Sequence, residues 1–171
     1  MGTATFQIYE DYNERNVTKL HMVLFNDALE HLTRVHRALR MHRGHVLVIG
    51  IGGSGKKSVI RLASYAANFQ IFEIALTRGY GEASFRDDMR TLYNKVGVEN
   101  RRIVFLFTGA HVVDESFLEL VNNMLMTGVV PALFSDEDKD EIVNSCRSQA
   151  VEAGFGITRF DLNFTWTSEI R

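Results

Sequence analysis

The hydrophobic positions between residues 22 and 40 lie three or four residues apart, which is the spacing of an amphipathic helix. Basic residues gather near its end, where cations suit the carboxyl end of the helix dipole, and Gly44 is predicted to stop the helix. Residues 1–21 show little periodicity and are predicted to form an extended entry segment. The repeating apolar positions are Leu24, Phe25, Ala28, Leu29, Leu32, Val35 and Leu39.

Three short apolar runs, at residues 45–50, 71–76 and 103–107, predict β-strands. Their near-continuous apolar character is typical of strands that are buried on both faces of a parallel sheet. Each run is followed by a segment with helical spacing, and this alternation of strand and helix indicates an α/β fold with a parallel sheet. The predicted helices span residues 59–67, 85–97, 114–126 and 136–153.

Length and composition agree with a single globular domain. A chain of 171 residues has enough length to bury roughly 70% of the surface that its unfolded form exposes. Its net charge of -2 implies no general affinity for nucleic acid or for an anionic membrane. No apolar run approaches the roughly 18 residues of a membrane span, and the polar start of the chain does not predict a signal peptide. The single cysteine, Cys146, excludes an internal disulfide and fits the cytosol or nucleus.

A glycine-rich loop, GIGGSGKKS at residues 50–58, lies between the first predicted strand and its helix. It nearly matches the phosphate-binding pattern G-x-x-x-x-G-K-[ST], and it has the strand–loop–helix context which that pattern requires. Glycines let backbone N–H groups surround an anion, the helix N-terminus adds a positive dipole end, and the lysine adds a point charge. We therefore predict that ATP or ADP binds at Gly50, Gly52, Gly53, Ser54, Gly55, Lys56, Lys57 and Ser58.

The residues that would hold Mg²⁺ depart from this pattern. The hydroxyl that normally follows the lysine and ligates the metal is replaced by Lys57, and Ser58 lies about 100° further round the helix. Hydrolysis in such folds also needs a carboxylate at the tip of another strand, but the third predicted strand ends Phe107-Thr108-Gly109-Ala110-His111 without an acid. We therefore assign no catalytic residue and no metal ligand, and we expect little dependence on Mg²⁺.

The acidic pair Asp114–Glu115 and the histidine His111, both near this strand tip, can each be interpreted in two ways. Asp114 and Glu115 form an acidic pair that either opens the next helix, as an N-cap with an acidic first turn, or supplies an acid for hydrolysis. His111 is either part of the polar surface or a side chain that faces the nucleotide site. In each case the first reading is the one we predict.

Three segments carry a family resemblance: HRALRMHRGHVLVIGIGGSGKKSVIRLASY, IFEIALTRGYGEASFRDDMRTLYNKVGVEN and IVFLFTGAHVVDESFLELVNNMLMTGVVPALF. They resemble the fourth AAA+ module of the dynein heavy chain motor ring, in the axonemal branch, over about residues 22–158. That branch reads G-K-Q-S where this chain has Lys57 in place of the glutamine, and its members carry their strand-tip acid after the threonine, where this chain has Gly109. The family's N-N-x-L-x-x-G-x-V-P-x-L-F segment, predicted to be a turn with packing, is matched by Asn122, Asn123, Gly128, Pro131, Leu133 and Phe134.

The resemblance implies a P-loop NTPase (AAA+) α/β fold of three layers, with a parallel sheet flanked by helices. It would make residues 22–171 an AAA+ domain truncated before its sensor strand and lid, incomplete at the C-terminus, and residues 1–21 an entry segment. It implies a regulatory nucleotide-binding module of a microtubule motor, with poor or absent hydrolysis. Its place would be the cytoplasm and cytoskeleton, in the axoneme of a cilium or flagellum.

The partners implied by the resemblance are a nucleotide and the neighbouring AAA+ modules of the ring, with microtubules reached only indirectly and neither nucleic acid nor membrane bound. Two alternatives stay open: an active P-loop ATPase that uses an unplaced acid, and a structural or interaction module with a vestigial site. The tail at residues 160–167 alternates apolar and polar residues, which favours a half-buried strand, whereas the family would place a short helix there.

Overall fold

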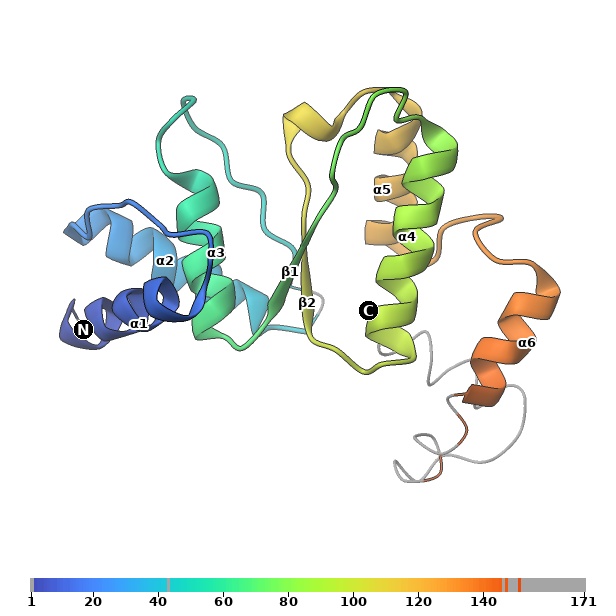
Figure 1. Cartoon of the computed structure of the whole chain (residues 1–171), viewed down its shortest axis with the longest axis horizontal. Coiled ribbons are helices and arrows are strands. Elements are labelled where there is room, and N and C mark those ends of the chain that lie inside the picture. The colour runs from blue at the N-terminus through green and yellow to red at the C-terminus, as the bar shows by residue number, and fades with distance from the viewer. Residues whose placement is uncertain (1, 43, 146, 148–150, 152–171) are drawn as a thin grey trace. The chain divides into compact units, whose positions relative to one another are not determined.

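The computed structural model describes residues 2–42, 44–145, 147 and 151. The chain divides into two compact units, Met1–Ile71 and Phe72–Arg171. The first unit contains three helices, and the second contains most of a two-stranded parallel sheet with three helices (Figure 1). In chain order the elements are α1 (Gly2–Arg15), α2 (Asn26–Leu39), α3 (Lys56–Ala66), β1 (Gln70–Glu73), α4 (Glu82–Gly97), β2 (Ile103–Leu106), the 3₁₀ turn η1 (Gly109–His111), α5 (Ser116–Thr127) and α6 (Asp136–Ser145).

The first unit is held together by an apolar core among α1, α2 and α3. Leu62 and Ala63 of α3 are fully buried, because they lie on the face of that helix which meets the other two. Helix α2 begins at Asn26 rather than at residue 22. Of the predicted apolar stripe it buries Ala28, Leu32 and Val35, whereas Phe25 precedes the helix and is exposed. The buried members of this core are Tyr12, Leu20, Leu32, Val35, Leu62 and Ala63.

The extended conformation predicted for residues 1–21 is wrong for residues 2–15, which form α1. Ile8 and Tyr9 each lie about one helical turn before Tyr12. Tyr12 is part of the core of the first unit, and the other two pack against it. Only a few apolar side chains, two of them tyrosines, mark this face, so the segment has a weak helical signal. The face is fixed by contact with α3, where the Tyr65 hydroxyl donates a hydrogen bond to Asp11 Oδ2 (2.5 Å).

The strand predicted for residues 45–50 is also wrong, because the described structure has no strand there. Burial on both faces would require neighbouring strands and covering helices, and the described sheet contains only β1 and β2. Exposure instead alternates along the segment. Leu47 and Ile49 are each 85% exposed, whereas Val48 between them packs against the core of the first unit.

The second unit is built on the predicted β–α–β order. Strands β1 and β2 confirm the apolar runs at 71–76 and 103–107, although each strand has four residues. Helices α4 and α5 lie along the same side of the sheet (Figure 1), as the helical spacings predicted. Their contact is aromatic: the ring of Phe85 stacks on that of Phe117 with centroids 4.6 Å apart, and both side chains are fully buried.

The segment after α5, at residues 128–134, is a packed turn as predicted, whereas Asn122 and Asn123 of the same predicted segment lie within α5. Gly128 ends α5 with a φ of 76°, in the left-handed region that favours glycine. Two arginines of α4 donate to carbonyl oxygens of the turn: Arg86 Nη1 to Pro131 at 3.1 Å, and Arg90 Nε to Leu133 at 2.7 Å. Leu133 is buried beneath these contacts.

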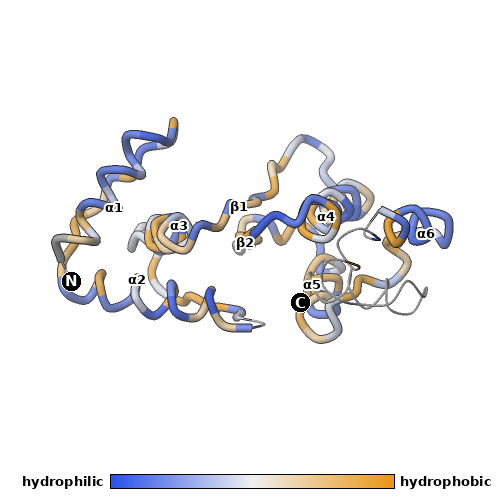
Figure 2. The backbone as a smooth tube through the Cα atoms, turned by 90° about the horizontal axis from the view of Figure 1, so that it is seen from below, coloured by the Kyte–Doolittle hydropathy of each residue, from blue (hydrophilic) through white to orange (hydrophobic). Residues whose placement is uncertain are grey.

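Helix α6 confirms the start of the helix predicted for 136–153, and most of the remainder lies outside the described residues. Figure 2 shows that hydrophilic residues cover most of α6, which buries only Ile142 and Val143. The tail at 160–167, whose strand or helix was left open, also lies outside the described residues. Among the described helices, none combines the length and the apolar character needed to span a bilayer.

Candidate nucleotide-binding site

The glycine-rich loop leads into the N-terminus of α3 through two left-handed glycines. Gly53 and Gly55 both have a φ of 77°, a conformation that side chains with a Cβ rarely adopt. Gly55 is the N-cap of α3 and has no side chain to cap the helix. The carbonyl of Gly55 accepts the first helical bond, from the Val59 N–H at 3.0 Å. The amides of the first turn therefore lie ahead of the helical ladder, where they form a positive end suited to an anion.

The ammonium group of Lys56 lies inside the loop. Its Nζ donates to the carbonyl oxygens of Gly50 (2.7 Å) and Ile51 (2.6 Å), and it lies 3.4 Å from Ser54 Oγ. These contacts hold one full positive charge at the uncapped end of α3. A phosphate placed there would meet the lysine and the first-turn amides together.

The glycines of the loop serve different purposes. A Cβ added to Gly50 would lie 3.4 Å from Ser54 Oγ and 3.6 Å from Lys56 Cδ, so this glycine lies against the lysine that fills the loop. A Cβ added to Gly52, Gly53 or Gly55 would meet no atom within 4 Å. Glycine is therefore required at Gly53 and Gly55 by the left-handed backbone conformation and not by a lack of space for a side chain.

Lys57 and Ser58 follow in the first turn of α3. Lys57 is exposed, and Ser58 is half-buried. Successive residues of a helix point about 100° apart. Ser58 therefore points away from the direction in which a hydroxyl at position 57 would point. The first unit thus contains every loop residue predicted from the sequence, with an amine at the position where a metal-ligating hydroxyl is normally found.

The tip of β2 belongs to the second unit and carries no acid. Thr108 and Gly109 lead into the turn η1, and Gly109 is exposed. His111 closes this turn, and the prediction that it is polar surface is wrong, because it is only 5% exposed. Its Nδ1 accepts the Thr108 N–H at 3.1 Å, and its Nε2 lies 3.7 Å from Glu73 Oε1 at the end of β1.

Glu73 is a residue that reasoning from the sequence missed. It interrupts the otherwise apolar run at 71–76, and an acid in such a run is the signal that could have drawn attention to it. The side chain of Glu73 is 21% exposed, beside the nearly buried imidazole of His111. At the ends of the two strands, the carboxylate of Glu73 therefore lies beside the imidazole of His111.

Asp114 lies just before α5 and bonds its first residue, but the prediction that Asp114 is the N-cap is wrong. Its Oδ1 accepts the Ser116 N–H at 2.9 Å, and this hydrogen bond lowers the pKa of the exposed Asp114 carboxyl. The N-cap residue itself is Glu115, whose side chain makes no capping bond. The carboxylate of Asp114 thus satisfies an amide at the start of the helix, one position earlier than an N-cap residue would stand.

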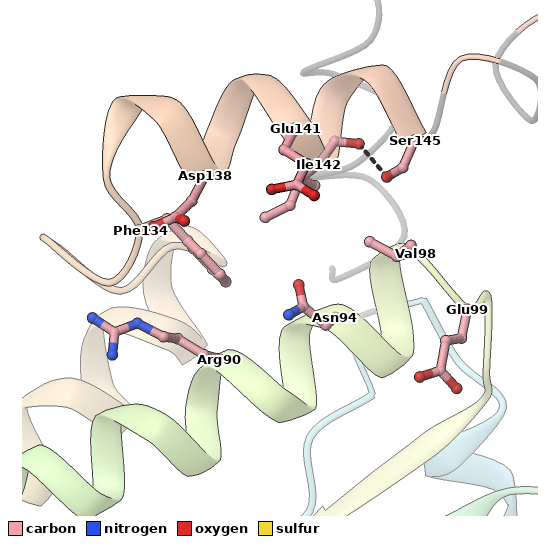
Figure 3. A pocket seen from close by; sticks show the side chains of 9 residues that line it. All are labelled: Arg90, Asn94, Val98, Glu99, Phe134, Asp138, Glu141, Ile142 and Ser145. Atoms are coloured by element: carbon pink, nitrogen blue, oxygen red, sulfur yellow. Dashed lines mark hydrogen bonds between the residues drawn. The ribbon is translucent and has the colours of Figure 1, made fainter.

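A separate cavity of about 400 Å³ lies between α4 and α6 in the second unit (Figure 3). Carboxylates of Glu99, Asp138 and Glu141 line it, and the arginine that lines it, Arg90, is already bonded to Asp87 and to the Leu133 carbonyl. This excess of negative charge disfavours a phosphate. Within the described part of the chain, no three side chains of His, Cys, Asp or Glu are grouped so as to hold a metal ion.

Comparison with known proteins identifies the family. The model of the family described as "P-loop containing dynein motor region D4" matches residues 20–171. The chain belongs to this dynein motor family. The resemblance to the fourth module of the dynein heavy chain is thereby confirmed, and so is the α/β fold of the P-loop class.

Axonemal dyneins are among the similar proteins. The human protein "Dynein axonemal heavy chain 10" is 58% identical over 154 residues, which are 90% of this chain and 3% of that protein. The Chlamydomonas reinhardtii protein "Dynein-1-alpha heavy chain, flagellar inner arm I1 complex" is 47% identical over 89% of this chain and 3% of its own length. The rat "Dynein axonemal heavy chain 1" is 41% identical over 95% of this chain and 4% of its own. The dynein motor region described here thus spans only a few per cent of these relatives.

Proposed function

We propose that this dynein motor region binds ADP or ATP and hydrolyses it poorly or not at all. The observation that carries the proposal is the Lys56 ammonium, held within the glycine-rich loop at the N-terminus of α3. The residues that would bind the phosphates are Gly50, Gly52, Gly53, Ser54, Gly55, Lys56, Lys57 and Ser58.

Two sources of positive potential converge on the loop. The amides of the first turn, which are donors without helical acceptors, give the helix end about half an elementary charge, and Lys56 adds a full charge. A diphosphate would draw on both, because its oxygens can accept from the amides and can replace the carbonyls of Gly50 and Ile51 as acceptors for the ammonium. None of these interactions requires a metal ion.

Poor hydrolysis is expected because the sequence lacks the groups that the P-loop pattern normally uses to hold Mg²⁺. Lys57 stands where a metal-ligating hydroxyl is normally found, and the tip of β2 offers Gly109 rather than a carboxylate. Asp114, the nearest acid further along the chain, is already committed to the amide of Ser116. Mg²⁺ would therefore contribute little to the binding of the nucleotide.

The names of the similar proteins supply the cellular context that we propose. They are axonemal and flagellar dyneins, so we place this chain within a heavy chain of the same kind, in the axoneme of a cilium or flagellum. There it would contact neighbouring AAA+ modules of the motor ring and regulate the main ATPase. Its link to the microtubule would be indirect.

A structural role is the second candidate, and the same lysine favours it. Because Lys56 already bonds two carbonyls of its own loop, it could serve only to hold the shape of the loop. Calorimetric titration of the full chain with ADP separates the two functions. Binding heat that is lost in Lys56→Ala but retained in Lys57→Ala supports a nucleotide site, whereas no heat with either ADP or ATP supports the structural role.

A further inference from the structure

His111 and Thr108 are joined by two hydrogen bonds at the end of β2. The Thr108 N–H donates to His111 Nδ1 at 3.1 Å, and the His111 N–H donates to the Thr108 carbonyl at 2.8 Å. Together they close the turn η1, which contains Gly109. The second bond belongs to the backbone, so the imidazole holds the Thr108 amide and not the whole turn.

Among the described residues, Glu73 and Phe107 lie beside this imidazole. From β1, Glu73 Oε1 lies 3.7 Å from Nε2, and at the end of β2 the ring of Phe107 lies 5.7 Å from the imidazole, centroid to centroid. The next acid along the chain, Asp114, is exposed and accepts the Ser116 amide. The imidazole thus has an apolar ring and a carboxylate beside it, in a nearly buried position.

The hydrogen bond from Thr108 fixes the protonation state of His111. A nitrogen that accepts a hydrogen bond carries no proton, so Nδ1 is bare and the proton of the neutral ring is on Nε2. That proton is on the side of the ring that faces Glu73. If Nδ1 gained a proton, two N–H donors would face each other and the bond to Thr108 would be lost.

We propose that His111 is a positioning residue which, as the neutral Nε2–H tautomer, holds the Thr108 amide at the end of β2 and releases it when Nδ1 is protonated. The proposal concerns the strand tip itself and does not require that nucleotide binds.

Two effects on the charged form oppose each other. Burial and the donor–donor conflict with Thr108 disfavour the cation, whereas the carboxylate of Glu73 favours it. The separation of 3.7 Å between Nε2 and Oε1 exceeds a hydrogen bond, so the carboxylate acts as a nearby charge. Glu73 therefore favours the charged imidazole, and with it the release of the Thr108 amide.

Nuclear magnetic resonance on the full chain tests the tautomer directly. Long-range ¹H–¹⁵N spectra at neutral pH are expected to show His111 with a bare Nδ1 and a protonated Nε2. The signal is assigned by its loss in His111→Asn. An Nδ1–H tautomer at neutral pH would overturn the proposal, whatever the outcome of any nucleotide titration.

Hydrogen exchange of the Thr108 amide tests the release. After correction for intrinsic exchange, its protection is expected to fall at least tenfold as the pH is lowered through the range where histidines titrate, near 6.5 for an unperturbed side chain. In His111→Asn the amide oxygen takes the place of Nδ1 but does not titrate, so protection should persist at both pH values. In Glu73→Gln the fall should move to lower pH.

Protection of Thr108 that falls equally in the wild type and in His111→Asn would show that the imidazole does not control the Thr108 amide, and would overturn the proposal. His111→Leu removes the acceptor and should leave Thr108 unprotected at every pH. If a substitution prevents folding, the pH dependence of Thr108 protection in the wild type, followed together with the ¹⁵N shift of His111, decides the question. The two transitions should then have the same midpoint.

Discussion

Tyr93 of α4 donates a hydrogen bond to the carbonyl oxygen of Gly128, the residue that ends α5, at 3.0 Å. The tyrosine is 2% exposed, so both groups are removed from water. The bond ties the last turn of α4 to the start of the packed segment at 128–134. It joins two elements that are distant in sequence, and it leads to a prediction about the stability of the second unit.

Replacement of Tyr93 by Phe should lower the free energy of unfolding by about 1–3 kcal/mol, because the buried carbonyl of Gly128 loses its donor. Urea unfolding followed by circular dichroism measures the change. Tyr12→Phe is the matched control, since Tyr12 is also buried but its hydroxyl has no hydrogen-bond partner among the described residues. Equal effects of the two substitutions would contradict the role of the Tyr93 hydroxyl.

Alkaline pH should destabilise the second unit. Burial raises the pKa of Tyr93, and burial together with the hydrogen bond to Asp88 raises that of Tyr80. A group whose pKa is higher in the folded state than in the unfolded state contributes stability that is fully present below its unfolded pKa, about 10 for tyrosine. That stability is lost as the pH rises above about 10. Urea midpoints measured from pH 8 to 11.5 should fall, and the fall should be smaller in Tyr93→Phe; a midpoint that is constant to pH 11.5 would contradict this account.

The periodicities in the sequence located most of the fold in this unit. Helix α4 repeats its apolar residues every three or four positions, so its buried face could be read from the chain alone. The run at 45–50 shows the limit of such reasoning. Its apolar residues indicate a preference for burial, but burial depends on neighbouring strands and helices, which a local pattern does not specify.

The candidate site likewise has one part that could be predicted from the sequence and one part that could not. The glycine-rich loop could be proposed as a phosphate site because all its chemistry lies within nine consecutive residues. The pair of His111 and Glu73 could not be predicted, because the contact joins the ends of two strands that are separated by a whole helix. The imidazole is buried because it accepts a backbone amide, a contact that depends on the turn and not on the composition around it.

The glycines of the loop offer a test with an internal control, because Gly55 is left-handed and Gly52 is not. Gly55→Ala should cost about 1 kcal/mol of stability, because a Cβ is strained at a φ of 77°. Gly52→Ala should be nearly neutral, since Gly52 is not left-handed and a Cβ there meets no atom. Chemical denaturation of both variants makes the comparison. A larger loss in Gly52→Ala than in Gly55→Ala would contradict the described loop.

A carboxylate at the strand tip should not by itself restore hydrolysis. Gly109 is exposed, its φ is not left-handed and a Cβ there meets no atom within 4 Å, so Gly109→Asp is expected to fold without strain. Lys57 still occupies the position of the metal-ligating hydroxyl, and no glutamate has been placed to activate water. Phosphate release from ATP should therefore stay at the background of the wild type. Turnover well above wild type in this single variant would show that the other defects matter less than we infer.

Binding should depend on Lys56 and be insensitive to Mg²⁺. The helix end, the loop amides and Lys56 attract the phosphates without a metal, whereas the usual metal partners are missing at Lys57 and Gly109. We expect weak binding of ADP and ATP. At 100 times its dissociation constant a ligand stabilises the fold by about 2.7 kcal/mol, enough to raise the midpoint of a thermal melt.

The melt should shift equally with millimolar ADP in Mg²⁺ and in EDTA. Lys56→Ala should abolish or greatly reduce the shift, because it removes the side-chain charge that is held inside the loop. Lys57→Ala is the matched control: it removes the same charge from an exposed neighbouring position and should matter less. A folded chain whose melt is unmoved by nucleotide would refute binding. A shift that appears only with Mg²⁺ would mean that Ser58, or an acid such as Asp114, reaches the metal after all.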